Sequence, residues 1–277
     1  MHLEHRDLSY ATIAQSPSGQ LLIRTFENLT GRPAVLWRMR MLADKVAAGQ
    51  NIWDALFDTF DLTLNRIGAP LPTTGPLMVI ANHPYGLVDS LSLCKLLADR
   101  EQPFKVVAND IFLRAGPIAD HILPISFDPG RDAARRNLET RRAALATLNE
   151  GGTVAMFPSG ATASPPRPFA APHEGPWSSF AARIALDSGA PVAPVYFPLK
   201  RRLIFDNVGF VNPILRHGLQ INGFYRRIGS TVDAYMGQPI LLNPTTHNAT
   251  TATAALRRAL LTLGSDGTDP SVEGTRF

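Results

Sequence analysis

Six short apolar runs, separated by helical stretches, constrain the fold of this chain more than any other feature of its sequence. Each run has the length of a β-strand. The runs are LMVIA at 77–81, FKVVA at 104–108, ILPIS at 122–126, TVAMF at 153–157, PVAPVYF at 191–197 and TVDAYMG at 231–237. Helical patterns occupy 87–100, 131–149, 177–188 and 247–264. The alternation predicts an α/β domain with a mixed, largely parallel sheet flanked by helices, whose sites lie at the strand ends.

A helical N-terminal segment precedes this alternation. Asn51 can cap a helix with one apolar stripe, formed by Ile52, Trp53, Leu56, Phe57, Phe60 and Leu64. An earlier helix begins near Pro33 and carries several basic residues, Arg32, Arg38, Arg40 and Lys45. We expect both helices to pack on the main domain; the alternative for the basic helix is a position on anionic lipid. The predicted division is a helical segment (1–66), a main domain (67–264) and a disordered polar tail (265–277).

The composition excludes several classes of protein. With 45% hydrophobic residues, the 277-residue chain can bury a sizeable core. Its single cysteine, Cys94, excludes a disulfide framework, and its leucine neighbours predict a core position. A net charge of +4 with scattered basic residues argues against nucleic-acid binding, but it suits an anionic surface or ligand.

The chain shows no signal peptide and no segment that reads as a membrane span. The N-terminal residues MHLEHRDLSY are charged, and the uncharged stretch 67–88 is interrupted by prolines and by Asn82 and His83. We therefore expect a cytoplasmic protein that contacts the inner face of the membrane peripherally.

A histidine follows the first apolar run, in the segment ANHPYGLVDS at 81–90. Pro84 biases His83 away from helical backbone, so its ring can project from the loop. Asp89 begins the next helix and can bond one ring nitrogen, which leaves the other free to accept a proton. A turn in which His83 and Asp89 only cap the helix explains the same spacing.

Two later segments complete the candidate site. TVAMFPSGATAS at 153–164 leaves a strand and turns at Pro158, where Gly160 permits close approach of a ligand. GAPVAPVYF at 189–197 is most simply a buried strand. The basic helix 131–149 can be a solvated face or can dock an anionic carrier. Two further basic groups, Lys200, Arg201, Arg202 and Arg226, Arg227, fit lipid headgroups or solvent equally well.

In their order and spacing these segments resemble the glycerolipid and lysophospholipid acyltransferase family, the relatives of 1-acylglycerol-3-phosphate acyltransferase. The first family block, Asn-His followed by aspartate, is similar to Asn82, His83 and Asp89. The block Phe-Pro-Glu-Gly is similar to Phe157, Pro158, Ser159 and Gly160, and the Val-Pro-Val strand to Ala193, Pro194 and Val195. The stretches around 81–89 and 106–126 resemble the hemolysin-like or ornithine-lipid branch. The resemblance covers roughly 75–240.

The resemblance implies an enzyme that transfers a fatty acyl group from a thioester of acyl-carrier protein or coenzyme A to a hydroxyl of a lyso-lipid or hydroxy-lipid. His83 would act as the base and Asp89 would orient it. Asn82, Gly86 and the block Phe157, Pro158, Ser159, Gly160 would line the substrate. Backbone N–H groups around Gly160, or in the helix after Gly86, would hold the oxyanion. No metal or resident cofactor is implied, and the remaining histidines, His2, His5, His121, His173, His217 and His247, form no ligand-spaced cluster.

The chain departs from the family pattern at three places. Five residues rather than four separate His83 from Asp89, Ser159 replaces a glutamate, and Ala163 replaces an arginine. In the family the latter two are associated with a glycerol-phosphate acceptor, so we expect an acceptor without a bare phosphate, such as a lyso-aminolipid. Arg167 is the nearest downstream cation that could replace the arginine.

Two other classes of function stay open. The changed Phe-Pro-Ser-Gly block is compatible with a non-catalytic module that binds lipid or acyl carrier and keeps the fold. A hydrolase that activates water with His83 and Asp89 is the second, although no serine lies in a Gly-x-Ser-x-Gly setting.

Overall fold

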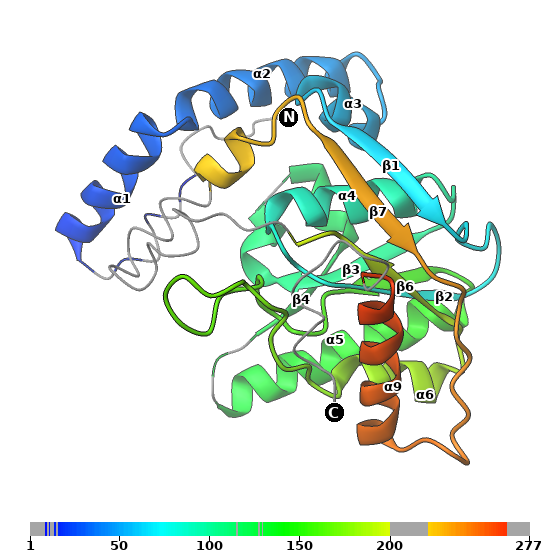
Figure 1. Ribbon diagram of the computed structural model, residues 1–277. Helices are drawn as coiled ribbons and strands as arrows, with labels where there is room; N and C mark the ends of the chain where they lie inside the picture. The colour runs from blue at the N-terminus through cyan, green and yellow to red at the C-terminus, as the bar shows by residue number, and fades with distance from the viewer. Residues whose placement is uncertain are drawn as a thin grey trace.

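The centre of the molecule is a seven-stranded sheet with the strand order β1-β7-β6-β2-β5-β3-β4 (Figure 1). The structure, a computed structural model, describes residues 9, 11, 14, 16–114, 116–126, 128, 130–199 and 221–264. The strands are β1 (Thr63–Gly68), β2 (Leu77–Ala81), β3 (Phe104–Asn109), β4 (Ile122–Ile125), β5 (Thr153–Met156), β6 (Val192–Tyr196) and β7 (Thr231–Met236). All neighbouring pairs are parallel except β6 and β7. The predicted mixed, largely parallel sheet is confirmed.

Helices cover both faces of this sheet (Figure 1). They are α1 (Pro17–Leu29), α2 (Arg32–Ala47), α3 (Ile52–Thr59), α4 (Leu87–Ala98), α5 (Arg131–Asn149), α6 (Phe180–Ser188) and α9 (Ala249–Thr262), with 3₁₀ helices η2 (Asp110–Arg114) and η3 (Gly116–His121) and a helical turn over 221–225. Alternate residues of β2 serve the two layers. Val79 packs in a core with α3 and α4, and Met78 packs in a second core with α5, α6 and α9.

The central strand β2 is buried on both faces, which explains its unbroken apolar run. Every residue of β2 and of β6 is buried. Val79 lies opposite Ala155 on β5 and Ala193 on β6. A parallel sheet enclosed by helices excludes water from both faces, so the sequences of such strands are nearly continuous apolar runs. The carboxyl ends of β2, β5 and β6 consequently meet at one edge of the sheet.

The N-terminal prediction is confirmed at α3 and wrong after it. The Asn51 side chain accepts a hydrogen bond from Trp53 N at 2.9 Å and caps α3, as expected. The helix ends at Thr59, and 63–66, expected to be helical, belong to β1, which pairs with β7. Leu64 therefore lies on a strand. Asp61, with a φ of +50°, interrupts the helix, and the hydrogen bonds that favour a strand come from a segment far along the chain.

The two first helices, α1 and α2, form what we call the N-terminal arm, which extends from α3 along one side of the molecule (Figure 1). Val35 and Leu42 join the core that contains α3. Five large apolar residues of the arm are exposed, namely Leu21, Leu22, Leu29, Trp37 and Met41. The described residues include no helix of the length and hydrophobicity needed to cross a membrane.

The arm also contacts the helical turn at 221–225. The Asn222 side chain donates a hydrogen bond to the Thr30 carbonyl at 2.6 Å. Gly31, with a φ of +121°, lies so close to Tyr225 that a Cβ at position 31 would stand 2.4 Å from its ring. Only glycine fits at this crossing.

Several predictions concern residues outside the described ranges. These are the tail 265–277, the basic group Lys200, Arg201 and Arg202, and the histidines His2, His5 and His217. The division into an N-terminal segment and a main domain stays a prediction.

Loss of the α3 cap should destabilise the fold measurably. In Asn51→Ala the Trp53 N–H loses its acceptor, and we expect the free energy of unfolding to fall by about 1 kcal/mol. Urea unfolding followed by circular dichroism measures this. Asn51→Ser, which keeps an acceptor oxygen, should retain most of the stability; an alanine variant as stable as the parent would contradict the assignment.

Candidate functional site

His83 lies in the loop that follows the carboxyl end of β2, and the Asn82 side chain anchors the start of this loop. Asn82 Nδ2 donates to the Phe197 carbonyl at 2.8 Å, and Asn82 Oδ1 accepts from Phe197 N at 2.7 Å. Asn82 is 4% exposed and Phe197 directly follows β6. These two hydrogen bonds extend the link between β2 and β6 beyond their last strand residues. They fix the position at which the loop that carries His83 begins.

The carboxylate of Asp89 faces the His83 ring from the first turn of α4. Asp89 Oδ2 lies 3.2 Å from His83 Nδ1, and the Asp89 side chain is completely buried. The same oxygen accepts hydrogen bonds from Tyr85 N at 2.6 Å and Gly86 N at 3.0 Å. Gly86, at a φ of +82°, provides the left-handed turn into the helix. Asp89 therefore both caps α4 and contacts the ring, so the two interpretations of this spacing are compatible.

The contact between His83 and Asp89 has the separation of an ion pair without the alignment of a hydrogen bond. His83 Nδ1 and Asp89 Oδ1 are both buried, and neither has a hydrogen-bond partner within the described ranges. Burying an unpartnered polar atom is costly. A rotation of the His83 ring or of the Asp89 carboxylate that aligned Nδ1 with a carboxylate oxygen would form a hydrogen bond and relieve that cost.

The segment after β5 packs directly against His83. Phe157 stacks on the His83 ring with centroids 4.0 Å apart and an angle of 25° between the planes. Ala163 N donates to the His83 carbonyl at 2.8 Å. Gly160, at a φ of +68°, closes a turn in which its N–H donates to the Phe157 carbonyl at 3.0 Å. The N–H groups of Gly160 and Gly86 are thus already engaged within their own turns.

Glu174 is the residue of this site that our sequence interpretation missed. Its carboxylate accepts from His83 N at 3.3 Å and from Trp177 Nε1 at 3.3 Å, and it lies close to the Ser159 side chain, whose hydroxyl donates to the Ala161 carbonyl at 3.0 Å. Glu174 is 6% exposed, and this burial raises the pKa of its carboxyl group, against the effect of the hydrogen bonds. A single acidic residue in the segment PHEGPW, 91 positions after His83, was the only signal.

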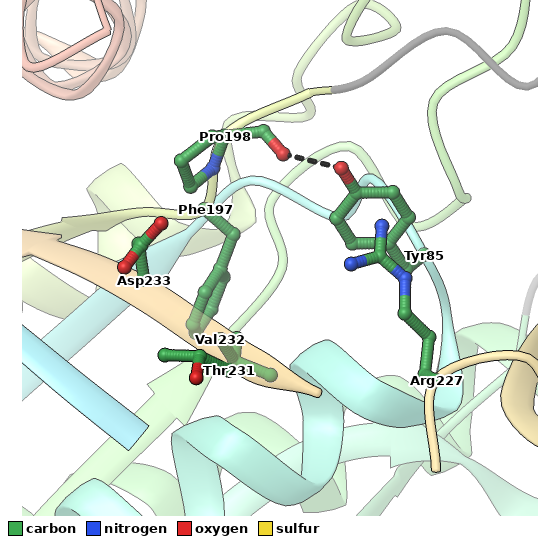
Figure 2. A pocket seen from close by; sticks show the side chains of 7 residues that line it. All are labelled: Tyr85, Phe197, Pro198, Arg227, Thr231, Val232 and Asp233. Carbon is green, nitrogen blue, oxygen red and sulfur yellow. Dashed lines mark hydrogen bonds between the residues drawn. The ribbon is translucent and has the colours of Figure 1, made fainter. Parts of the chain in front are cut away.

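Tyr85 and Arg227 border a small hollow beside the His83 loop (Figure 2). The Tyr85 hydroxyl donates to the Pro198 carbonyl at 2.7 Å, and Arg227 Cζ lies 3.8 Å from the centre of the Tyr85 ring. Phe197, Pro198 and the start of β7 complete the lining. The close approach of a guanidinium to an aromatic face is a cation–π contact. This contact places the positive charge of Arg227 against Tyr85, which lies two positions after His83.

Arg167 and Ala163 occupy contrasting positions. Ala163 is 3% exposed beneath His83, whereas Arg167 is exposed in a loop closed by the bridge between Ser164 and His173. Within the described residues His83 contacts Asp89, Phe157, Ala163 and Glu174, and Arg167 is not among these partners. The contact of Arg167 with an acceptor stays a prediction.

Cys94 lies in the core, as predicted. It is 5% exposed, and burial raises the pKa of its thiol to about 12. A thiol with such a pKa holds almost no thiolate near neutral pH. Among the described residues, no three histidine, cysteine, aspartate or glutamate side chains gather as a metal site.

A comparison with known protein families matches the part of the chain that contains the candidate site. Residues 66–198 match the acyltransferase family. The matched acyltransferase region is just under half of the chain. It begins in β1, ends after β6, and contains His83, Asp89 and the turn at Gly160. A comparison with curated proteins found no match.

Among solved structures, the chain is similar to the crystal structure of the 1-acyl-sn-glycerophosphate (LPA) acyltransferase, PlsC, from Thermotoga maritima. The two sequences are 15% identical, the TM-score is 0.46, and the alignment covers 88% of this chain and 96% of the other.

Proposed function

We propose that this protein is a lipid acyltransferase. It moves a fatty acyl group from a thioester of acyl-carrier protein or coenzyme A to a hydroxyl of a lyso-lipid or hydroxy-lipid, in membrane lipid synthesis. The observation that carries the proposal is the His83–Asp89 pair at the carboxyl end of β2, within the region that matches the acyltransferase family.

In the proposed reaction His83 is the general base. Its Nε2 takes the proton of the acceptor hydroxyl while the oxygen attacks the thioester carbonyl. Asp89, facing Nδ1, favours the tautomer that leaves Nε2 free and stabilises the imidazolium that forms. Collapse of the tetrahedral intermediate breaks the carbon–sulfur bond, and the imidazolium returns the proton to the thiolate. The products are an ester and a free thiol.

The negative oxygen of the intermediate requires hydrogen-bond donors. The Gly86 and Gly160 N–H groups already have acceptors, so we assign this role to the next N–H groups of the first turn of α4, at Leu87 and Val88. First-turn N–H groups have no acceptor within their own helix, and the helix dipole favours negative charge there.

The surroundings of Ser159 support an acceptor whose headgroup is not a bare phosphate. Asn82, Gly86, Phe157, Pro158, Ser159, Gly160 and Arg167 are the proposed substrate contacts. Near Ser159 lies the Glu174 carboxylate, and Ala163 presents no cation. A phosphomonoester carries nearly two negative charges and needs cationic or N–H donors. A lyso-aminolipid, with a positive amine, suits this environment better.

The N-terminal arm supports peripheral attachment to the inner face of the membrane. Exposed apolar residues such as Trp37 and Leu29 accompany the basic residues Arg38 and Arg40. Apolar side chains can enter the headgroup region while cations attract anionic lipid.

Loss of His83 should abolish transfer without loss of the fold. In His83→Ala we expect the rate of acceptor-dependent loss of a labelled acyl thioester to fall by about 10²–10⁴-fold, with an unchanged circular dichroism spectrum. Asp89→Asn should cost less, because the ring keeps a neighbour that lacks only the charge.

His247→Ala, a histidine outside the site, serves as the matched control and should keep full activity. A fully active, folded His83→Ala would remove the proposed catalytic role. The second candidate function, which the serine at position 159 favours, is a non-catalytic module that binds lipid or acyl carrier. If the protein is such a module, neither the parent nor any variant should show acceptor-dependent loss of thioester.

The acceptor can be tested directly. With one acyl donor, we expect lyso-ornithine lipid or another lyso-aminolipid to be acylated faster than lysophosphatidic acid. A clear preference for lysophosphatidic acid would contradict this prediction. In that case Arg167→Ala identifies whether Arg167 supplies the phosphate contact, by a rise in KM for that acceptor.

Membrane binding should be peripheral and should depend on the arm. High salt should release most of the protein from a membrane fraction, since screening weakens the cation attraction. Trp37→Ala should weaken sedimentation with anionic vesicles about tenfold, the effect of losing roughly 1.5 kcal/mol of apolar burial. Leu138→Ala, an exposed apolar residue of α5, should not. Retention after high-salt and carbonate washes would contradict peripheral attachment.

A further inference from the structure

Glu174 places a buried carboxylate against the His83 loop and beside the turn after β5. It receives one hydrogen bond from the main chain of His83 and one from the indole of Trp177, and the Ser159 side chain lies close to it. The segment that carries Glu174 is bound to the turn after β5 by a hydrogen bond from Ser178 N to the Pro158 carbonyl at 3.3 Å. Glu174 thus connects the His83 loop to a segment that is itself attached to this turn.

This contact completes the restraint on His83. The N–H of His83 donates to Glu174, its carbonyl accepts from Ala163 N, and its ring stacks on Phe157. Asp89 then limits the ring from the side of α4. The main chain is held on both sides of one residue in a loop, although regular secondary structure supplies neither bond.

The burial of Glu174 makes the charged form of its carboxyl group unfavourable. Taking a carboxylate out of water costs several kcal/mol unless hydrogen bonds compensate. A buried acidic group that stability alone does not favour, and that contacts the proposed base, fits a role in the reaction.

We propose that Glu174 is a positioning residue for His83. Its carboxylate fixes the main chain of His83 relative to the Ser159 turn, and its charge adds to that of Asp89 in stabilising the imidazolium formed during proton transfer. The assignment rests on the proposed function, because it gives Glu174 a task only if His83 is the base.

Three variants separate position from charge. Glu174→Gln keeps an oxygen that accepts from His83 N but removes the charge, and we expect kcat to fall about tenfold with little change in KM for the acyl thioester. Glu174→Ala removes both and should lower kcat about a hundredfold. Glu139→Gln, the same change at an exposed position of α5, is the matched control and should retain the parental kcat.

The pH dependence of activity provides a readout that a merely structural role would not move. Among the described residues, Asp89 and Glu174 are the acidic groups that contact His83, so Glu174→Gln leaves the imidazolium one neighbouring charge fewer. We expect the acid limb of the kcat/KM profile to move to lower pH in Glu174→Gln. Glu139→Gln should leave the profile unchanged.

Stability should change in the opposite direction to activity. Because burial raises the pKa of Glu174 above its value in the unfolded chain, the parent loses stability as pH rises through the folded-state pKa. Glu174→Gln has no such group, so its thermal midpoint relative to the parent should improve from acidic to neutral pH while kcat falls.

The outcomes distinguish the two proposals. If Glu174→Gln leaves kcat and the acid limb of the kcat/KM profile at parental values, or if all variants lose activity only in proportion to unfolding, the positioning role is wrong. If the parent shows no acyl transfer while the NMR resonance of the His83 main-chain N–H still shifts in Glu174→Gln, the contact is real and the proposed function fails instead.

Discussion

A fully buried carboxylate, that of Asp89, determines how the chain passes from β2 into α4. A buried charge without partners costs several kcal/mol, so the loop must bring donors to it. The main-chain N–H groups of Tyr85 and Gly86 donate to Asp89 Oδ2, and the His83 ring lies against the same oxygen. The requirement that folds the loop is therefore the same one that arranges the proposed base.

The central strands were predictable because their environment is uniform. β2, β5 and β6 are buried on both faces, so their sequences are unbroken apolar runs with clear ends. β1 was not predictable, because its residues are mostly exposed. Its partner β7 lies about 168 positions away, so no local sequence pattern indicates the pairing. The cap at Asn51 was predictable because its hydrogen bond spans only two residues.

The same distinction separates the site residues that were predicted from those that were not. His83, Asp89 and Phe157 follow strands that the pattern identifies, and the parallel topology brings the ends of those strands together. Glu174 comes from a segment without regular structure, and its contact depends on the course of the loop after Gly160. Its carboxylate lies beside Ser159, the position at which the resembled family has a glutamate. A search confined to aligned blocks would overlook it.

The antiparallel pairing of β7 with β6 has a consequence for how the parts of the molecule communicate. It places the start of β7, and the helical turn before it, beside the His83 loop, where Arg227 covers Tyr85. The same turn is held to the arm by Asn222 at Thr30 and by Tyr225 at Gly31. The turn therefore contacts the arm through Asn222 and Tyr225 and the loop that carries His83 through Arg227. One short segment thus lies between the surface proposed to rest on lipid and the centre proposed to act on it.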